Sequence, residues 1–284
     1  MRQRRLFDCL INLPTGILAA SCLVFALGLV LVLSLRTNDG RLIAASFTLE
    51  NYRSAATDAL FGFILAKSFL IAAFVSLATV ALAYPVAYYI AFHAGEHRAV
   101  WLILVTLPFW TSYLLRIFAW KIILGYNGIM NSAFVSLGVP GAPFETLLYN
   151  PTAMVMTLAH AYAAFAILPI YVSLSAIEPR LLEAAMDLGA RPSTVFGCVV
   201  LPLSLPGVGA AVALVFIPTL GDYATPVLVG GPSSTMIGNL IQAQFSKADN
   251  WPLGAAMATL TMVTLCALYG GGRLGARLWQ WRQA

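Results

Sequence analysis

Three residues in the first half of the chain could together bind a metal ion. His93, Glu96 and His97 fit the H-x-x-E-H pattern of one class of metalloproteases, in which two imidazoles one helical turn apart bind zinc. Gly95 interrupts the pattern, and the short polar segment around it is more typical of a solvated turn. We expect a polar turn here and no metal site. The alternative is an intramembrane metalloprotease built on these three residues.

The chain also lacks the residues that bind and split ATP. A P-loop reads G-x-x-x-x-G-K-[ST], and none of Lys67, Lys121 and Lys247 follows a glycine. No Rossmann fingerprint is evident either. We therefore expect a protein that is not an enzyme, with no catalytic residue and no cofactor bound by the chain itself.

The composition places these residues in a membrane protein. Of the 284 residues, 60% are hydrophobic and 10% are charged, whereas a soluble domain has about 45–50% apolar and about 25% charged residues. A helix needs about 20 apolar residues to cross a bilayer. Six segments qualify, at residues 13–35, 65–90, 100–124, 152–177, 195–220 and 253–272. We predict an all-α polytopic membrane protein with six transmembrane helices, as a single domain over residues 1–284.

The distribution of basic residues predicts the orientation. With six helices, both termini and the second and fourth loops share one side of the membrane. The basic residues on that side are Arg2, Arg4, Arg5, Arg98, Arg180, Arg191, Arg273, Arg277 and Arg282. Those on the opposite side are Arg36, Arg41, Arg53 and Lys247. Since the side richer in Lys and Arg is cytoplasmic, we expect both termini in the cytoplasm. The net charge of +5 then reports topology and does not indicate nucleic-acid binding.

Three basic residues lie inside the predicted helices. Lys67, Arg116 and Lys121 all fall toward the outer ends of their helices in this orientation. Long basic side chains near a helix end can extend toward the interface and keep their charge in water. All three can therefore extend outward.

The fourth loop, residues 178–194, is the longest polar interruption on the cytoplasmic side. Pro179 suits the first turn of a helix, Gly189 suits the position after its end, and Pro192 suits the start of the next helix. Apolar residues recur at helical spacing between them: Leu181, Leu182, Ala185 and Leu188. We predict a helix-turn-helix elbow beneath the membrane. Its charged residues should point away from the bilayer: Glu183, Asp187 and Arg191.

This loop resembles that of ATP-binding cassette (ABC) importer permeases, which carry E-A-A-x3-G-x9-I-x-L-P. The matching residues are Glu183, Ala184, Ala185, Gly189, Val199 in place of isoleucine, Leu201 and Pro202. The resemblance implies a coupling helix that docks on a separate ATPase subunit, which would bind ATP and Mg²⁺. A small Ala-Ala pair allows close approach to that partner, and the glycine supplies a left-handed turn. The predicted coupling residues are Glu183, Ala184, Ala185, Asp187, Gly189, Leu201 and Pro202.

Other segments resemble the permeases of spermidine/putrescine importers, namely residues 107–125, 221–231 and much of 237–256. The resemblance implies two ATPase subunits, a second and different permease subunit, and a soluble periplasmic or extracellular binding protein that delivers the cargo across a bacterial inner membrane. Related importers for opines, other cationic amino compounds or ferric iron share much of this pattern. The substrate therefore stays open among these classes, with polyamines favoured.

A polyamine is a flexible cation, and a path for it should contain carboxylates and aromatic rings. Asp222 lies at the outer end of the fifth helix and is followed by Tyr223, while Trp110 and Tyr113 lie three residues apart on the third helix. We predict these four residues as the substrate path. The alternatives are a capping carboxylate at Asp222 and helix-packing aromatic residues at 110 and 113.

A secondary transporter driven by an ion gradient is the competing transport mechanism. Such a carrier is expected to place ionisable residues near the bilayer midplane, often within inverted repeats. The first, fourth, fifth and sixth predicted helices carry no formal charge, and no inverted repeat is evident. The ABC importer permease is therefore favoured.

Overall fold

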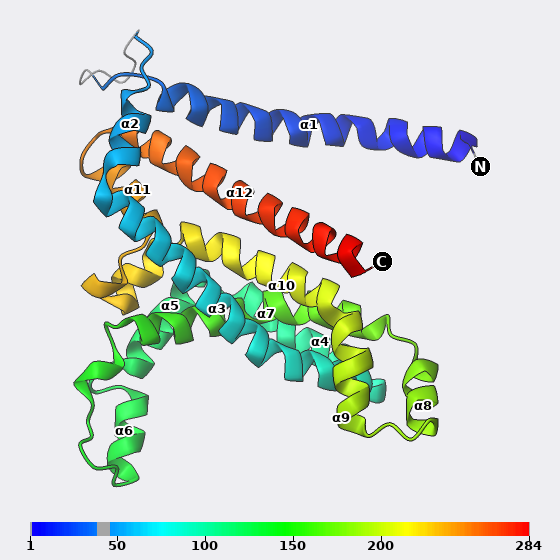
Figure 1. Ribbon diagram of the computed structural model, residues 1–284. Helices are drawn as coiled ribbons and strands as arrows, with labels where there is room; N and C mark the ends of the chain where they lie inside the picture. The colour runs from blue at the N-terminus through cyan, green and yellow to red at the C-terminus, as the bar shows by residue number, and fades with distance from the viewer. Residues whose placement is uncertain (1, 39–45, 284) are drawn as a thin grey trace. The chain divides into compact units, whose positions relative to one another are not determined.

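The structure is a computed structural model and is built of helices (Figure 1). It describes the backbone of residues 2–38 and 46–283, and the side chains of residues 16–38 and 46–271. Within these ranges the only other regular pairing is one antiparallel bridge between Arg36 and Phe47. The predicted all-α fold is confirmed. Several basic residues used for the orientation lie outside the described side chains: Arg2, Arg4, Arg5, Arg41, Arg273, Arg277 and Arg282.

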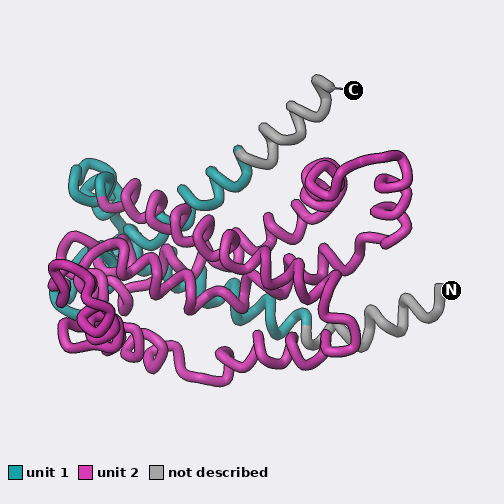
Figure 2. The backbone as a smooth tube through the Cα atoms, turned by 90° about the horizontal axis from the view of Figure 1, so that it is seen from below, with its two compact units in different colours: residues 1–63, 240–284 teal, residues 64–239 magenta. Residues whose placement is uncertain are grey.

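The chain divides into two compact units (Figure 2). The first unit comprises residues 1–63 and 240–284, and in it α12 packs against both α1 and α2. The bounds of these helices are α1 Arg2–Ser34, α2 Glu50–Thr57 and α12 Trp251–Gln283.

The second unit comprises residues 64–239 and holds the candidate site. It includes most of α3 (Ala59–Phe92) and ends within α11 (Ile237–Ser246). The α-helices between them are α4 Arg98–Thr106, α5 Tyr113–Leu124, α6 Ile129–Ser136, α7 Pro151–Ser175, α8 Pro179–Asp187, α9 Pro192–Val195 and α10 Leu201–Gly221. Short helical turns connect them: η1 Gly95–His97, η2 Leu107–Trp110, η3 Glu145–Leu147, η4 Phe196–Val200, η5 Pro226–Gly230 and η6 Pro232–Ser234.

Among the described residues, five helical segments are long and apolar enough to cross a membrane, or six when one bent pair is taken as a single span. The five are Gly16–Ser34, Ala59–Phe92, Pro151–Ser175, Pro192–Gly221 and Trp251–Gly271. Each overlaps a predicted transmembrane helix. The bent pair covers the remaining one, so the six segments correspond to the six predicted spans.

The third predicted span, residues 100–124, is not one straight helix. The segments Gly95–Trp110 and Tyr113–Ser136 meet at an angle of 91°. Pro108 lies in the 3₁₀ turn η2 before the bend and has no backbone N–H to donate. Thr111 and Ser112 then take extended conformations, with ψ of 145° and 137°, and α5 begins in a new direction.

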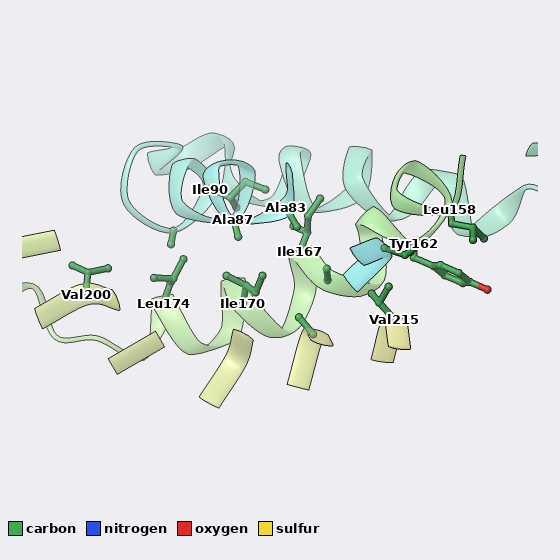
Figure 3. Close-up of a cluster of buried hydrophobic side chains, with 14 of the residues drawn as sticks. Ala83, Ala87, Ile90, Leu158, Tyr162, Ile167, Ile170, Leu174, Val200 and Val215 are labelled. Carbon is green, nitrogen blue, oxygen red and sulfur yellow. The ribbon is translucent and has the colours of Figure 1, made fainter. Parts of the chain in front are cut away.

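The core of the second unit forms where α3, α7 and α10 pack together (Figure 3). Ala83, Ala87 and Ile90 of α3 face α7, whose Ile170 and Leu174 lie in the same cluster. On α10, Gly207 lies close against the backbone of α7. A Cβ atom there would lie 2.4 Å from Ser173 Cβ and 2.6 Å from the Pro169 carbonyl oxygen. Small residues therefore let these helices touch along their backbones.

The three basic residues inside the predicted spans behave differently from one another. Lys67 Nζ donates a hydrogen bond to the Ser233 carbonyl oxygen in the loop after the fifth span, as expected for a side chain that extends outward. Lys121 Nζ lies 5.8 Å from the centre of the Tyr149 ring. Arg116 instead runs sideways, and its Nη1 donates to the Ala161 carbonyl oxygen inside α7 at 2.6 Å. Arg116 is thus bonded to the backbone of the neighbouring helix and does not extend outward, and its buried Nε has no hydrogen-bond partner among the described residues.

Candidate functional site

The fourth loop folds into the predicted elbow, with α8 and α9 as its two arms (Figure 1). Pro179 is in the first turn of α8, and Pro192 is in the first turn of α9. Gly189 follows α8 in a left-handed conformation with φ of +83°. Its N–H bonds to the Met186 carbonyl oxygen at 2.8 Å, and the Ala190 N–H bonds to the Ala185 carbonyl oxygen at 3.1 Å. These two bonds make a Schellman motif, so the helix end is closed by its own backbone.

The apolar stripe of α8 is divided between two environments. Leu182 and Ala185 are partly buried, and Leu182 packs against the core of the second unit. Leu181 and Leu188 are exposed, with 89% of Leu188 accessible, and Ala184 beside the stripe is exposed as well. The predicted stripe therefore does not lie wholly against the chain. One side anchors the elbow, and the other side is a free apolar surface.

Charged residues occupy a further face of α8. Glu183 and Asp187 are four residues apart, so they lie on adjacent turns of one side of the helix, and both are exposed. The exposed apolar side and this acidic side together give a surface that a partner could bind through burial and charge. This exposure is compatible with the coupling role predicted for these residues, which stays a prediction.

The second arm of the elbow runs directly into the fifth span. The helical segment from Pro192 to Gly221 is continuous over 30 residues, with the π-helical turn η4 between α9 and α10. Pro202 has no N–H, and the Leu201 N–H bonds five residues back to the Phe196 carbonyl oxygen. Leu201 and Pro202 therefore lie within the fifth span, at the start of α10, while the Glu183 to Gly189 part of the motif forms the elbow.

Asp222 is a buried capping residue at the other end of α10. Its side chain is 7% exposed, and Oδ1 accepts hydrogen bonds from the N–H groups of Ala224 at 2.9 Å and Thr225 at 3.3 Å. Oδ2 accepts a bond from the Tyr113 hydroxyl at 2.8 Å, and that hydroxyl is also 2.9 Å from Thr225 Oγ1. The structure thus brings together two of the four predicted path residues, and it gives Asp222 the geometry of an N-cap.

The other two predicted path residues lie apart from this pair. Trp110 is 89% exposed and precedes the break in the third span, whereas Tyr113 follows it. The helical spacing of Trp110 and Tyr113 expected from the sequence is therefore interrupted. Tyr223 is exposed, and its carbonyl oxygen accepts a bond from Asn239 Nδ2 at 2.7 Å.

Aromatic residues that sequence reasoning did not select extend from Tyr113. Tyr162 of α7 stacks on Tyr113, with ring centres 6.0 Å apart and an angle of 24°. Phe165 contacts Tyr162 at 6.0 Å, and Phe109 contacts Phe165 at 4.4 Å. The spacing of Tyr162 and Phe165 on one helical face was visible in the sequence, but their contact with the third span requires the fold.

The H-x-x-E-H segment forms a turn after α3. Glu96 and His97 lie in the single 3₁₀ turn η1, and Gly95 has a positive φ of +50°. His93 stacks on Tyr89 with an angle of 6° and a centre distance of 6.1 Å. Among the described residues, no group of three His, Cys, Asp or Glu side chains is arranged to hold a metal ion.

The chain is similar to two transport proteins over most of its length. The spermidine/putrescine transport system permease protein PotB of Haemophilus influenzae is 34% identical over 245 residues, which is 85% of each chain. PotB of Escherichia coli is 36% identical over 230 residues, covering 81% of this chain and 83% of that protein. No family model matches the chain.

A solved structure shares the fold. It is a bacterial alginate ABC transporter in complex with an alginate pentasaccharide-bound periplasmic protein. The matched chain superposes with a TM-score of 0.68 at 14% identity, over 98% of this chain and 96% of that one. At this identity the similarity concerns the helical architecture alone.

Proposed function

Since the chain belongs to the family of spermidine/putrescine ABC transporter permeases, we propose that it forms half of a translocation path for polyamines. The observation that carries the proposal is the identity of 34–36% over more than four fifths of the chain. The cargo would be a spermidine-like or putrescine-like cation, delivered by a soluble binding protein. The chain would lie in a bacterial inner membrane with both termini in the cytoplasm.

The elbow supports a transporter in which separate subunits bind ATP and this chain forms the transmembrane path. The chain has no P-loop lysine, so ATP and Mg²⁺ would be bound by two separate ATPase subunits. The exposed face of α8, with Leu181, Ala184 and Leu188, offers an apolar surface on which such a subunit could dock. Because α9 continues into α10, a displacement of the docked elbow would move the fifth span.

The other half of the path would come from a second, homologous permease. The resembled importers pair two different permeases, so we propose a heterodimer. Within this chain, the Tyr113–Asp222 pair is the best candidate for contact with cargo, because it joins a carboxylate to an aromatic ring at the outer end of the fifth span. Trp110 and Tyr223 are exposed enough to take part from separate positions.

Reconstituted transport tests the proposal. The chain, its sister permease, the ATPase subunits and the binding protein would be assembled in liposomes, and uptake of labelled spermidine and putrescine would be measured. We expect uptake that requires both ATP and the binding protein. Uptake that persists without ATP and stops when ion gradients are collapsed would show a secondary transporter and overturn the proposal. ATP-dependent uptake of an opine or ferric iron, but of no polyamine, would support an ABC importer and would overturn the proposal that its substrate is a polyamine.

A further inference from the structure

We propose that Phe196 passes the movement of the coupling elbow to α3 by holding two tyrosines on either side of Pro85. Phe196, Tyr84 and Tyr88 are here called the aromatic clasp. The inference rests on the proposed function, because it describes how ATP-driven movement of the elbow would reach a second transmembrane helix. It assigns a positioning residue that lies outside the predicted coupling residues.

The clasp is defined by two edge-to-face contacts. The Phe196 ring centre lies 5.9 Å from that of Tyr84, with an angle of 90° between the rings. It also lies 5.9 Å from that of Tyr88, with an angle of 74°. Tyr84 and Tyr88 are four residues apart on α3 and therefore present adjacent rings on one face. Edge-to-face geometry depends on ring orientation, so the contact transmits position as well as burying apolar surface.

On the side of the elbow, Phe196 has no flexible connection to α9. It is the first residue of η4 and directly follows Val195, the last residue of α9. The N–H groups of Thr194 and Val195 both bond to the Arg191 carbonyl oxygen, which ties α9 to the turn of the elbow. A displacement of the second arm of the elbow would therefore displace the Phe196 ring as well.

On the side of α3, the two tyrosines of the clasp flank a proline inside the helix. This residue, Pro85, lies between Tyr84 and Tyr88. It has no N–H to donate to the carbonyl four residues earlier, so the helix bends there more easily than elsewhere. The Tyr88 ring continues to Phe92 at 4.9 Å and to His93 at 5.6 Å, which connects the clasp to the inner end of α3.

A hydrogen bond fixes the first tyrosine to the same span. The Tyr84 hydroxyl lies 2.9 Å from Ser204 Oγ, and Ser204 of α10 is fully buried. Tyr84 is therefore held at its ring by Phe196 and at its hydroxyl by Ser204. Phe196 begins the π-helical turn η4, and Ser204 follows that turn and Pro202, so the helix is irregular between the two anchors of the clasp. The hydroxyl of Tyr84 is therefore held by α10, whereas the Tyr88 ring follows Phe196 and the arm of the elbow. Movement of the elbow would then change the bend at Pro85.

Variants of Phe196 test the clasp in the assembled transporter. Phe196→Leu keeps an apolar side chain and removes the ring, while Phe196→Tyr keeps the ring. In Phe196→Leu we expect normal amounts of bound ATPase, and a fall in polyamine uptake per ATP hydrolysed of at least about fivefold, because both ring contacts are lost. Phe196→Tyr should keep most of the uptake per ATP of the unaltered protein, because it keeps the ring. If Phe196 acted only by apolar packing, the leucine variant would keep that ratio as well.

Phe216→Leu is the matched control. Phe216 of α10 contacts Phe69 of α3 at 5.7 Å, so this variant removes an aromatic contact between the same two helices, away from the elbow. We expect its uptake per ATP to stay within about twofold of the unaltered protein, since general packing tolerates such a change. An equal loss of the ratio in both leucine variants, or no loss in Phe196→Leu, would overturn the clasp.

A second readout needs no cargo and so separates the clasp from the proposed substrate. A cysteine at exposed Glu96, in a background without the native cysteines, reports on the segment just after α3. Its rate of thiol labelling should differ between the ATP-bound and nucleotide-free complexes, and Phe196→Leu should abolish that difference while Phe216→Leu keeps it. A difference that persists in Phe196→Leu would refute the clasp, even if the transporter carried no polyamine.

Discussion

Replacing Gly189 by valine should break coupling without breaking the fold. Gly189 has φ of +83°, and a Cβ atom at this position would meet no other atom within 4 Å. A clash is therefore not the cause of the expected defect. The cost comes from the left-handed backbone, at about 1–2 kcal/mol for a residue with a side chain. That cost lowers the population of the elbow conformation described here, relative to conformations in which the end of α8 is open, by a factor of about 5–30.

The control is a glycine with the same geometry elsewhere in the chain. Gly138 has φ of +67°, and a Cβ atom added to it would also meet no atom within 4 Å, but it lies after α6 in the third loop. Gly138→Val should carry a similar strain and leave coupling intact. Gly189→Asn should be milder than Gly189→Val, because asparagine adopts the left-handed conformation more readily.

The assay compares insertion, ATPase association and uptake for the three variants at matched expression. We expect all three to insert, and only Gly189→Val to lose most of its uptake, with weaker retention of the ATPase during purification. Normal uptake together with normal ATPase association in Gly189→Val would refute the role assigned to the elbow. A similar loss of uptake in Gly138→Val would show that backbone strain acts through general stability instead.

Three further outcomes are expected from the described contacts. Gly207→Ala should lower the free energy of unfolding of the purified chain by about 1–3 kcal/mol, because the added Cβ would lie 2.4 Å from Ser173 Cβ. Gly209→Ala is the control for a change in helix propensity alone, because a Cβ there would meet no atom within 4 Å. Asp222→Asn should preserve assembly and basal ATP hydrolysis, since asparagine caps comparably, and reduce polyamine uptake; unchanged uptake over several concentrations would leave Asp222 as a structural cap. A cysteine replacing Ser193, without the native cysteines, should react with an impermeant thiol reagent only after the cytoplasmic face is opened, and labelling of intact cells would refute the orientation.

Local signals in the sequence were enough to predict the elbow. Pro179 and Pro192 set the starts of two helices, and Gly189 set the end of the first, because each acts through the backbone of its own few residues. The six apolar segments were equally predictable, since crossing a bilayer requires length and hydropathy that any window average detects.

Features that depend on packing between distant segments were not predictable in this way. Hydropathy carries no information about backbone angles, so the hydropathy pattern predicts one straight helix where Thr111 and Ser112 interrupt the third span. The sideways course of Arg116 depends on a carbonyl of α7, 45 residues away. The Tyr113–Asp222 bond likewise joins residues 109 apart, and its capping geometry was only one of two alternatives before the fold was known.

The break in the third span has a consequence for hydration. Thr111 and Ser112 are exposed, and the Ser112 side chain makes no capping bond to the first N–H groups of α5. A helix start leaves such donors without partners from its own backbone, and in hydrocarbon each would cost several kcal/mol. The start of α5 must therefore open onto water or onto polar groups of another subunit, never onto lipid tails. The backbone itself thus identifies the side of the third span that faces a polar environment, where a cation would meet hydrogen-bonding groups in place of lipid.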